Sequence, residues 1–385
     1  MKILYITPEP PSDYSGGGIV VKQSILSLAK LNTEIDYIGP SSIDFDIQKY
    51  TSKIFYIKKN KNILFRVIDF VFSQATSSFY RDLNIIMNQL DLNAYDFIYL
   101  EFSKFSFLSK KIKDHKVVTR LHNIEYDYCK AKLKNNFSLF NLVKFIFSKN
   151  KEKKVLKYTD ILIPLTKEDK KRTLSLYKKT ISESNIRIIP ICLEKNSTSK
   201  IEIDKNTFRF LITGSLWYGP NSEGVLWFLK NVWSDFKNYN NIELTIAGSN
   251  PNSKIKKKAT NFNNVKLIES PKSMKPYFSA ADFYIAPIFT GAGMKVKIGE
   301  ALSHGLFLIC TPHSIIGYNV QNIENGFVCS SAQEFIINIK KILENKIKQK
   351  KIKIIKRNNL SLYKNNYDIS ESMKKYKKIL KEIKE

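Results

Sequence analysis

Short apolar runs separated by polar turns predict a chain of alternating strands and helices. Residues 2–7, KILYIT, form an apolar run that is typical of a buried strand. A turn-rich loop, PEPPSDYSGGG at 8–18, comes next, and IVVKQSILSLAKL at 19–31 then repeats apolar residues at helical spacing. A strand, a glycine-rich loop and a helix in this order are typical of the start of a nucleotide-binding α/β unit.

The remaining apolar runs fall into two series. A polar segment at 192–206, CLEKNSTSKIEIDKN, has no apolar periodicity and predicts a linker between them. Because strands that alternate with helices form parallel sheets, we expect an α/β protein of two doubly wound, Rossmann-like domains. The expected strands are residues 34–39, 96–101, 116–123, 160–166 and 186–191 before the linker, and 208–215, 242–249, 265–270, 281–288 and 306–312 after it.

Two further segments have helical patterns. NSEGVLWFLKNVW at 221–233 predicts a helix with Asn221 or Ser222 as its N-cap. The Lys-rich tail at 339–385 includes MKKYKKILKEI, which fits a docked amphipathic helix, although a low-complexity tail has a similar composition. The predicted organisation is an N-terminal domain at 1–191, the linker at 192–206, a C-terminal domain at 207–365 and a final helix at 366–385.

Composition narrows the class of protein. The 385 residues carry a formal charge of +28, with lysine spread along the whole chain. No zinc-ligand, RNP-type or basic-zipper pattern accompanies this charge, so we expect no nucleic-acid partner. A solvated surface with attraction to an anionic ligand or membrane explains the charge better. The four cysteines form no CxxC pair and the N-terminus lacks a signal peptide, which indicates a cytoplasmic protein, soluble or peripheral.

Two glycine-rich stretches follow predicted strands. Ligands of open α/β sheets bind beyond the carboxyl ends of the strands, and glycine lets an anion approach the backbone closely. The two stretches together favour a ligand held between the domains. The glycines are Gly16, Gly17 and Gly18 after the first strand, and Gly291 and Gly293 before a helix at 294–304.

Two lysines and a glutamate belong to the second stretch, TGAGMKVKIGEALSHG at 290–305. Backbone amides at a helix N-terminus bind anions, and Lys295 and Lys297 would add positive charge there. Glu300 would accept hydrogen bonds from ribose hydroxyls next to a diphosphate. The same residues also fit a glycine turn with solvated lysines and a Lys297–Glu300 pair at i, i+3.

A polar cluster, RLHNIEYDY at 120–128, follows another predicted strand. His122 in this cluster could contact a sugar or orient a leaving group. A structural histidine is the competing interpretation. Glu101 ends the strand at 96–101 and is a further candidate for the same site.

The segment IAPIFTGAGMKVKIGEALSHGLFLICT at 285–311 resembles the donor-binding segment of glycosyltransferases with the GT-B fold, in particular family 4. The resemblance is strong over residues 205–330 and looser before them. It implies that Glu300 binds the ribose of a nucleotide sugar. It also implies that Gly293, Met294 and Lys295 lie at the diphosphate.

Two other stretches of the C-terminal half share this resemblance. GSLWYGPNSEGVLWFL at 214–229 is similar to the first strand and helix of the family's donor domain, which implies that Gly214 and Trp217 face the cleft. VKLIES at 265–270 is similar to the strand end next to the base, which implies roles there for Ile268 and Glu269.

The sequence departs from the family pattern at two places. Many members carry two glutamates eight residues apart, and Ala292 occupies the earlier position here. The usual basic residue after the first donor-domain strand is not evident, because Trp217 and Tyr218 occupy that region. A subgroup with the pattern G-x-G-x-K-x-K-x-x-E matches better, which implies that Lys295 and Lys297 supply the missing phosphate charge.

The N-terminal half carries the looser part of the resemblance. PPSDYSGGG at 10–18 resembles the loop that closes on the donor phosphates and the acceptor, and LHNIE at 121–125 resembles a segment with a cleft histidine, here His122. The GT-B fold implies two Rossmann-like domains that face a central cleft. It also implies that the helix at 366–385 packs back on the N-terminal domain.

The reaction that the resemblance implies is transfer of a sugar, of hexosyltransferase type, from a nucleotide diphosphate sugar to a glycan or lipid-linked acceptor, with retention. No Asp-x-Asp motif is evident near the expected site, so we expect neither a metal nor another cofactor. The implied setting is biosynthesis of a surface polysaccharide such as capsule or lipopolysaccharide. A nucleotide-sugar epimerase of the same fold and a non-enzymatic polyanion-binding protein are the alternatives.

Two basic, aromatic segments with helical patterns lie at 58–74 and 135–154. Ordinary core helices of the N-terminal domain would explain most of their apolar residues. Their basic flanks could also rest on an anionic leaflet, which would make the protein peripheral on the inner face of the cell membrane.

Overall fold

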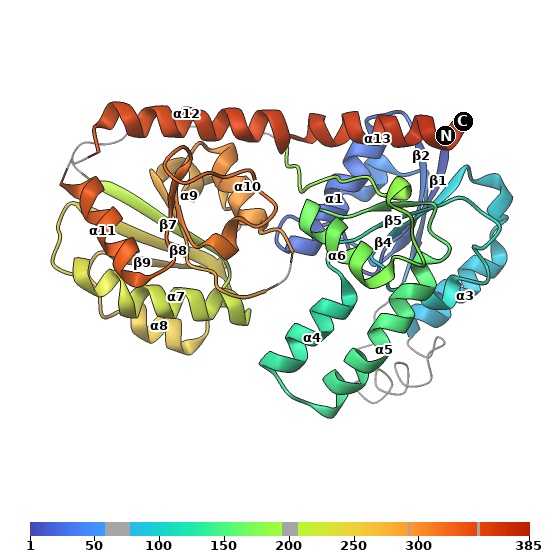
Figure 1. The fold of residues 1–385 in the computed structure, drawn as a ribbon, viewed down its shortest axis with the longest axis horizontal. Coiled ribbons are helices and arrows are strands. Elements are labelled where there is room, and N and C mark those ends of the chain that lie inside the picture. The colour runs from blue at the N-terminus through green and yellow to red at the C-terminus, as the bar shows by residue number, and fades with distance from the viewer. Residues whose placement is uncertain (58–77, 195–206, 292, 345–346) are drawn as a thin grey trace. The chain divides into compact units, whose positions relative to one another are not determined.

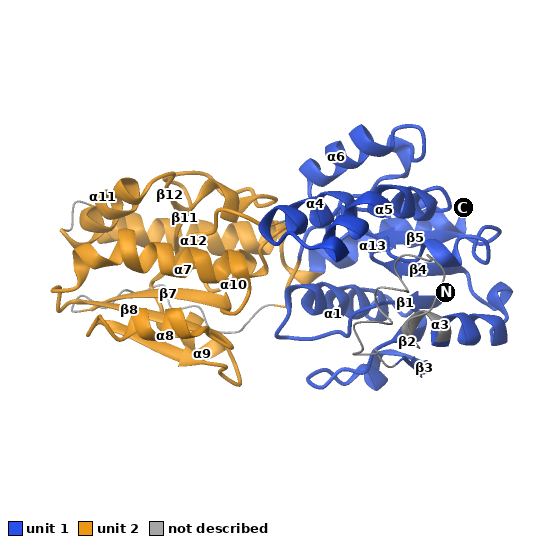
Figure 2. Cartoon of the chain, turned by 90° about the horizontal axis from the view of Figure 1, so that it is seen from below, with its two compact units in different colours: residues 1–191, 370–385 blue, residues 192–369 orange. Residues whose placement is uncertain are grey.

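The computed structural model describes all residues except 58–77, 195–206, 292 and 345–346. The chain divides into two compact units (Figure 2). Unit 1 comprises Met1–Ile191 and Ser370–Glu385, and unit 2 comprises Cys192–Ile369. Each unit contains one parallel six-stranded sheet, which confirms the predicted α/β class with two doubly wound halves. Residues 195–206 of the predicted linker lie outside the described residues.

The sheet of unit 1 has the strand order β3-β2-β1-β4-β5-β6. Strand β1 pairs in parallel with β2 on one side and with β4 on the other, so the strand order reverses between β1 and β4. The strands are β1 (Lys2–Ile6), β2 (Glu34–Gly39), β3 (Lys53–Tyr56), β4 (Phe97–Glu101), β5 (Val117–Arg120) and β6 (Ile161–Ile163).

Helices cover both faces of this sheet because the strand side chains alternate between two cores. Ile3 and Tyr5 point to a core that α1 and α13 share, and Leu4 and Ile6 point to a core that includes side chains of α3 and α5 (Figure 1). The helices of unit 1 are α1 (Gly16–Ala29), α3 (Ser78–Gln89), α4 (Glu125–Asn135), α5 (Leu139–Leu156), α6 (Lys167–Tyr177) and α13 (Ile369–Lys384).

The prediction of a strand at 186–191 was wrong. This segment contributes only an isolated parallel bridge between Leu162 and Ile186. Pro164 and Pro190 lack the amide hydrogens that a continued ladder would need. Strand β3, which is only four residues long, completes the sheet at the opposite edge and was not predicted.

The sheet of unit 2 has the order β12-β11-β10-β7-β8-β9, so the strand order reverses between β7 and β10. Its strands are β7 (Phe208–Ser215), β8 (Ile242–Ser249), β9 (Val265–Glu269), β10 (Phe283–Ala286), β11 (Phe307–Cys310) and β12 (Gly326–Val328). Its helices are α7 (Gly219–Asn231), α8 (Ser253–Ala259), α9 (Lys275–Ala280), α10 (Val296–Ser303), α11 (Ala332–Leu343) and α12 (Gln349–Asn366).

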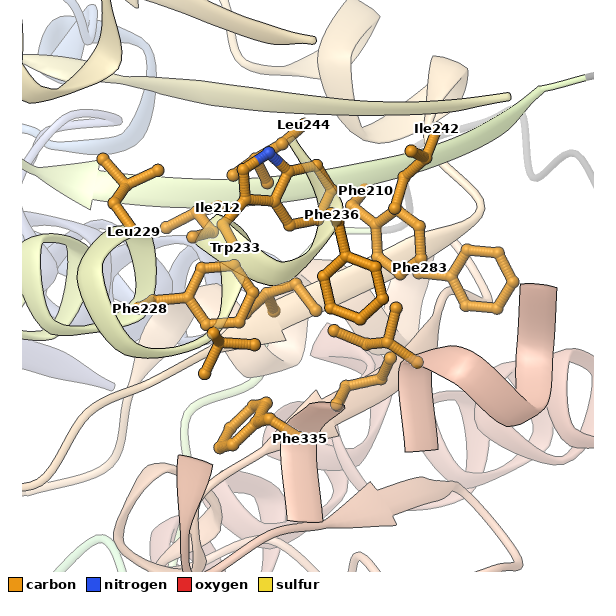
Figure 3. Close-up of a cluster of buried hydrophobic side chains, with 14 of the residues drawn as sticks. Phe210, Ile212, Phe228, Leu229, Trp233, Phe236, Ile242, Leu244, Phe283 and Phe335 are labelled. Atoms are coloured by element: carbon orange, nitrogen blue, oxygen red, sulfur yellow. The ribbon is translucent and has the colours of Figure 1, made fainter. Parts of the chain in front are cut away.

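An aromatic core holds α7 and α11 against this sheet (Figure 3). Phe210 of β7 stacks on Phe283 of β10 with ring centroids 4.8 Å apart, and Trp233 packs against the edge of Phe210. Phe228 of α7 meets Phe335 of α11 at 5.8 Å. These rings fix the two strands on either side of the strand-order reversal, which is where the site described below lies.

Buried polar groups fix α12 in unit 2. Lys356 forms an ion pair with Asp282 at 3.5 Å, and both side chains are fully buried. Asn359 donates hydrogen bonds from its side-chain amide to the carbonyl oxygens of Leu306 and Asn325. A buried polar group needs a partner, and the partners of these α12 side chains lie in the rest of unit 2. These contacts hold this part of the Lys-rich tail in place as an ordered helix.

Candidate functional site

The candidate site lies at the carboxyl edge of the unit 2 sheet, where the strand order reverses between β7 and β10. The segment after β7 leads into α7, and the segment after β10 leads through the glycine-rich stretch into α10. Neighbouring loops that leave a parallel sheet in opposite directions open a crevice between them, and this is the usual ligand position in such folds.

Gly214, at the end of β7, makes room for a lysine from α10. A Cβ atom at this position would lie 2.6 Å from Lys297 Nζ and 3.0 Å from Asn221 Nδ2. Its φ of +152° is also one that other residues rarely adopt. Glycine is therefore required for the lysine side chain to reach the strand end.

Asn221 holds this lysine in place. Lys297 Nζ donates to Asn221 Oδ1 at 2.7 Å, and Asn221 Nδ2 donates to the carbonyl oxygen of Ser215 at 3.0 Å. Asn221 is the third residue of α7, and the N-cap is Tyr218, so the prediction of Asn221 or Ser222 as the N-cap was wrong. The Asn221 side chain binds the lysine instead of capping the helix.

The electrostatic surroundings make the Lys297 ammonium unusual. Burial, together with the charge of Lys295, lowers the pKa of Lys297 to about 7, and the carboxylate of Glu300 acts against this shift. Near neutral pH this lysine is therefore partly neutral. An anionic ligand beside it would stabilise the charged form, because the negative charge compensates for the hydration lost on burial.

The backbone of the glycine-rich stretch contacts the other lysine, Lys295. Gly291 and Gly293 have positive φ values of 101° and 72°, which glycine adopts without strain. Lys295 Nζ donates to the carbonyl oxygens of Gly291 and Gly293, at 3.2 and 2.6 Å. His313 Nε2 also binds the Gly291 carbonyl at 2.8 Å. Lys295 thus contacts the backbone of the stretch that precedes it, whereas Lys297 reaches across to β7 and α7.

Glu300 lies in the second turn of α10, which begins at Val296 with Lys295 as its N-cap. Its side chain is partly exposed, whereas the Met294 side chain is buried. Met294 can therefore offer a ligand its backbone, while Glu300 can offer a carboxylate. Tyr318 fixes the start of the helix by donating from its hydroxyl to the Lys295 carbonyl oxygen at 3.0 Å.

The other predicted residues of unit 2 lie at neighbouring strand ends. Trp217 is 62% exposed and meets the ring of Tyr218 edge-on, directly after β7. Ile268 and Glu269 end β9, the edge strand that β8 separates from β7. Glu269 forms an ion pair with Lys256 at 2.5 Å. These residues lie on the same edge of the sheet as Gly214.

The N-terminal glycines lie at the start of α1, which the loop at 7–15 connects to the end of β1 in unit 1. Ser15 caps the helix, and its hydroxyl oxygen accepts a hydrogen bond from the Gly18 amide at 3.0 Å. A Cβ atom at Gly17 would lie 2.2 Å from Glu9 Oε2, so the loop before the helix comes close to its first turn. The stretch thus forms a capped helix N-terminus at the carboxyl edge of the sheet.

His122 and Glu101 meet at the same edge of the unit 1 sheet. His122 Nε2 is hydrogen-bonded to Glu101 Oε2, and the hydroxyl of Tyr5 donates to Glu101 Oε1 at 2.6 Å. Burial alone would raise the pKa of Glu101, but His122, Arg120 and hydrogen bonds together hold it below its usual value. The rings of His122 and Phe102 are tilted by 34° against each other, with their centroids 3.8 Å apart. Within the described part of the chain, its Nδ1 has no hydrogen-bond partner.

Arg120, from the same polar cluster, is fully buried and turns toward the C-terminal helix. It donates to the hydroxyl of Tyr376 at 2.9 Å, and Tyr376 meets the hydroxyl of Tyr99 at 2.6 Å. Arg120 therefore joins the sheet to α13 through hydrogen bonds. His122, two residues later, instead binds Glu101 at the end of β4.

Sequence reasoning missed two residues of the site. Asn221 was considered only as a helix cap, and His313 was not singled out at all. No local pattern marks either of them, since the partner of Asn221 is 76 residues away and that of His313 is 22 residues away. Across the described ranges, no group of three or more His, Cys, Asp or Glu side chains is placed to hold a metal ion. No described helix is long and apolar enough to cross a membrane.

Comparisons with known proteins show what this chain is similar to. Residues 207–345 match the family model of glycosyl transferases group 1. An uncharacterized 44.6 kDa protein in the cps region of Klebsiella pneumoniae is 26% identical over 313 residues, which are 77% of this chain and 76% of that protein. An uncharacterized glycosyltransferase of Methanocaldococcus jannaschii is 23% identical over 317 residues, 78% of this chain and 76% of that protein.

Solved structures share the fold along nearly the whole chain. A glycosyltransferase from Rickettsia africae superimposes with a TM-score of 0.72 at 16% identity, covering 99% of this chain and 98% of its own. Anabaena HepE in complex with UDP superimposes with a TM-score of 0.69 at 12% identity, covering 99% of this chain and 100% of its own. The chain is therefore a glycosyltransferase with the GT-B fold, and residues 207–345 of its second unit are the part that matches the group 1 family model.

Proposed function

We propose that this enzyme transfers a sugar from a nucleotide diphosphate sugar to a glycan or lipid-linked acceptor. The observation that carries the proposal is the Lys297 ammonium, which Asn221 holds over Gly214 at the strand-order reversal of unit 2. A partly desolvated cation next to glycine backbone at a strand end suits a diphosphate. The likeness to a HepE structure in complex with UDP supports the same class of donor.

The residues of unit 2 suggest how the leaving diphosphate is stabilised. Lys297 would neutralise its charge, while the backbone around Gly293 and Met294 would donate hydrogen bonds. Lys295 and His313 would stabilise the backbone conformation of the glycine-rich stretch through its carbonyl oxygens. Glu300, one turn further along α10, would accept hydrogen bonds from the ribose hydroxyls. Trp217, Ile268 and Glu269 remain candidates for contact with the rest of the nucleotide.

Further features of the reaction belong to the same proposal. Lysine and amide groups supply positive charge for the diphosphate, which supports a reaction that needs no metal ion or other cofactor. Retention of the anomeric configuration is what the family resemblance implies. His122, whose Nε2 is tied to Glu101 and whose other ring nitrogen is available, would contact the transferred sugar or the acceptor. Gly16, Gly17 and Gly18 would lie near the phosphates or the acceptor.

We also propose that the acceptor belongs to a surface polysaccharide such as capsule or lipopolysaccharide. The similarity to a protein in the cps region of Klebsiella pneumoniae supports this setting. A lipid-linked or membrane-proximal acceptor would bring the enzyme to the inner face of the cell membrane, as a peripheral protein. The charge of +28 suits contact with an anionic surface.

A thermal-shift panel with UDP, GDP, CMP and dTDP and their common sugars tests the donor. A ligand that binds the native state raises the melting temperature by mass action. We expect one nucleotide to stabilise the wild type and to lose most of that effect in Glu300→Ala. Glu324→Ala, which removes an exposed glutamate elsewhere in unit 2, is the matched control and should keep the shift.

The outcomes separate the proposed function from its rivals. Sugar transfer to an acceptor supports the transferase, whereas release of UDP with an altered sugar and no transfer would indicate an epimerase. No stabilisation by any nucleotide at millimolar concentration, combined with salt-sensitive binding to both DNA and heparin, would replace the proposal with a polyanion-binding protein.

A further inference from the structure

An exposed apolar surface lies on the hairpin formed by α4 and α5, which Figure 1 shows extending away from the sheet of unit 1. Phe137, in the turn between the helices, is 77% exposed, and Leu139, the first residue of α5, is 76% exposed. Ile146 and Phe147 are 57% and 41% exposed. Large apolar side chains of this kind are normally covered when they gather in one place.

Three of these residues share one face of α5. Positions 139, 146 and 147 are separated by seven and eight residues, so they lie on one face of α5. The apolar stretch LFNLVKFIF at 139–147 carries more apolar side chains than contact with α4 can cover, because it is apolar almost all round the helix. Core packing explains the partly buried residues of this stretch, but it does not explain the exposed Leu139, Ile146 and Phe147. The companion segment 58–74 lies outside the described residues.

Positive charge surrounds this apolar surface. From Tyr128 to Lys151 the hairpin carries six lysines and no acidic residue. Exposed lysines flank the turn on both helices, among them Lys130 and Lys134 on α4 and Lys149 on α5. Such a distribution complements an anionic surface, and it opposes pairing with a second copy of this chain, whose net charge is +28.

A buried carboxylate fixes the hairpin to the body of unit 1. Glu152, on α5, accepts hydrogen bonds from the amide of Glu125 at 3.0 Å and the amide of Tyr126 at 3.3 Å, at the start of α4. It also accepts from the hydroxyls of Ser103 at 2.8 Å and Tyr177 at 2.6 Å. The base of the hairpin is thereby held to the sheet and to α6, while the apolar turn at its other end stays exposed.

We propose that the α4–α5 hairpin is the docking surface for an anionic phospholipid bilayer. Phe137, Leu139 and Phe147 would enter the boundary between headgroups and acyl chains, and the lysines would contact the lipid phosphates. The inference deepens the membrane location proposed above and rests on it, but it does not depend on the identity of the donor.

Flotation of the full chain with vesicles of phosphatidylglycerol and phosphatidylcholine tests the proposal at low salt. We expect the wild type to float with these vesicles and to float much less with phosphatidylcholine alone. Phe137→Ser combined with Leu139→Ser should lower the partition constant by about tenfold or more, because two exposed apolar side chains no longer enter the bilayer. Ile43→Ser, at a fully exposed isoleucine elsewhere in unit 1, is the matched control and should float like the wild type.

A second measurement reports where the chain meets the lipid. The four native cysteines are buried, so an environment-sensitive fluorophore can be attached selectively to Phe137→Cys or, as a control, to Ile43→Cys. Anionic vesicles should shift the emission to the blue only for the label at position 137. Equal shifts at both positions, or flotation that the double serine variant leaves unchanged, would refute docking through the hairpin.

Measuring nucleotide binding in the same variants separates this test from the test of the donor proposal. The double serine variant should show the same thermal shift as the wild type with the nucleotide that stabilises it. Loss of flotation with an unchanged nucleotide shift supports docking through the hairpin. A wild type that responds to nucleotide but does not float with anionic vesicles at low salt would overturn the docking surface alone.

Discussion

The Lys297 ammonium predicts how donor binding depends on pH. Its pKa is lowered to about 7 by burial and by the charge of Lys295, so at higher pH the free enzyme holds it mainly in the neutral form. If the donor diphosphate binds beside Lys297 as proposed, it binds the charged form, and binding takes up a proton. Affinity for UDP should therefore fall as the pH rises above 7. The terminal phosphate of UDP, with a second pKa of about 6, is already ionised in this range.

The size of the effect follows from this pKa. If only the protonated lysine binds UDP, the dissociation constant should increase by about fifteenfold between pH 7 and pH 8.5, which corresponds to about 1.6 kcal/mol. Stability of the free enzyme should change in the opposite direction. The unfolded chain keeps the lysine proton up to its ordinary pKa, so unfolding becomes harder as the pH rises above 7, by at most about 1.4 kcal/mol per pH unit.

Isothermal titration calorimetry with UDP at constant ionic strength measures this slope. Lys297→Gln should bind UDP weakly and with little dependence on pH, because the titrating group is gone. Lys254→Gln removes an exposed lysine of the same unit and should keep the wild-type slope. The pKa of His313 is also lowered, by burial and by Lys295, so this histidine stays neutral in the chosen range.

Two results would contradict this role of Lys297. A wild-type dissociation constant that stays flat between pH 7 and 8.5 would mean that Lys297 does not titrate at the bound diphosphate. An unchanged slope in Lys297→Gln would assign the proton to another group.

Two further changes test packing in each unit. Gly224→Ala would place a Cβ atom 2.1 Å from the carbonyl oxygen of Pro287, so α7 must move, and the free energy of unfolding should fall by about 1–3 kcal/mol. Gly219→Ala, whose Cβ has 3.4 Å to its nearest neighbour, should be nearly neutral in the same chemical denaturation experiment. Tyr376→Phe removes an acceptor of Arg120 and should cost about 1–3 kcal/mol, with faster hydrogen exchange in α13; unchanged exchange would contradict the anchoring role.

Much of the fold could be predicted from local patterns. The run at 2–7 and the glycine stretch behind it identify a strand and a helix start from neighbouring residues alone, and the same holds for 208–215 and for the segment 290–305. Errors arose where the local pattern was misleading or too short. The apolar run at 186–191 looks like a strand, but prolines interrupt its ladder, and β3 is too short to stand out.

Which side chains meet depends on packing between distant segments. The sequence placed Lys295 and Lys297 together as equivalent phosphate ligands. In the folded chain, Lys295 binds the glycine carbonyls beside it, while Lys297 reaches Asn221 across the strand-order reversal. Only the pairing of β7 with β10 brings α7 and α10 close enough for that contact.

Exposure is decided by tertiary structure for the same reason. By its sequence alone, the stretch at 139–147 could be a core helix or a surface helix, because its apolar residues surround the helix axis. The folded chain covers one side of α5 and leaves Leu139 and Phe147 in solvent. Periodicity is a property of neighbouring residues, so it predicts most of the elements and their order. Burial and side-chain partners depend on what packs against each element, so they follow from the fold of the whole chain and cannot be read from a local pattern.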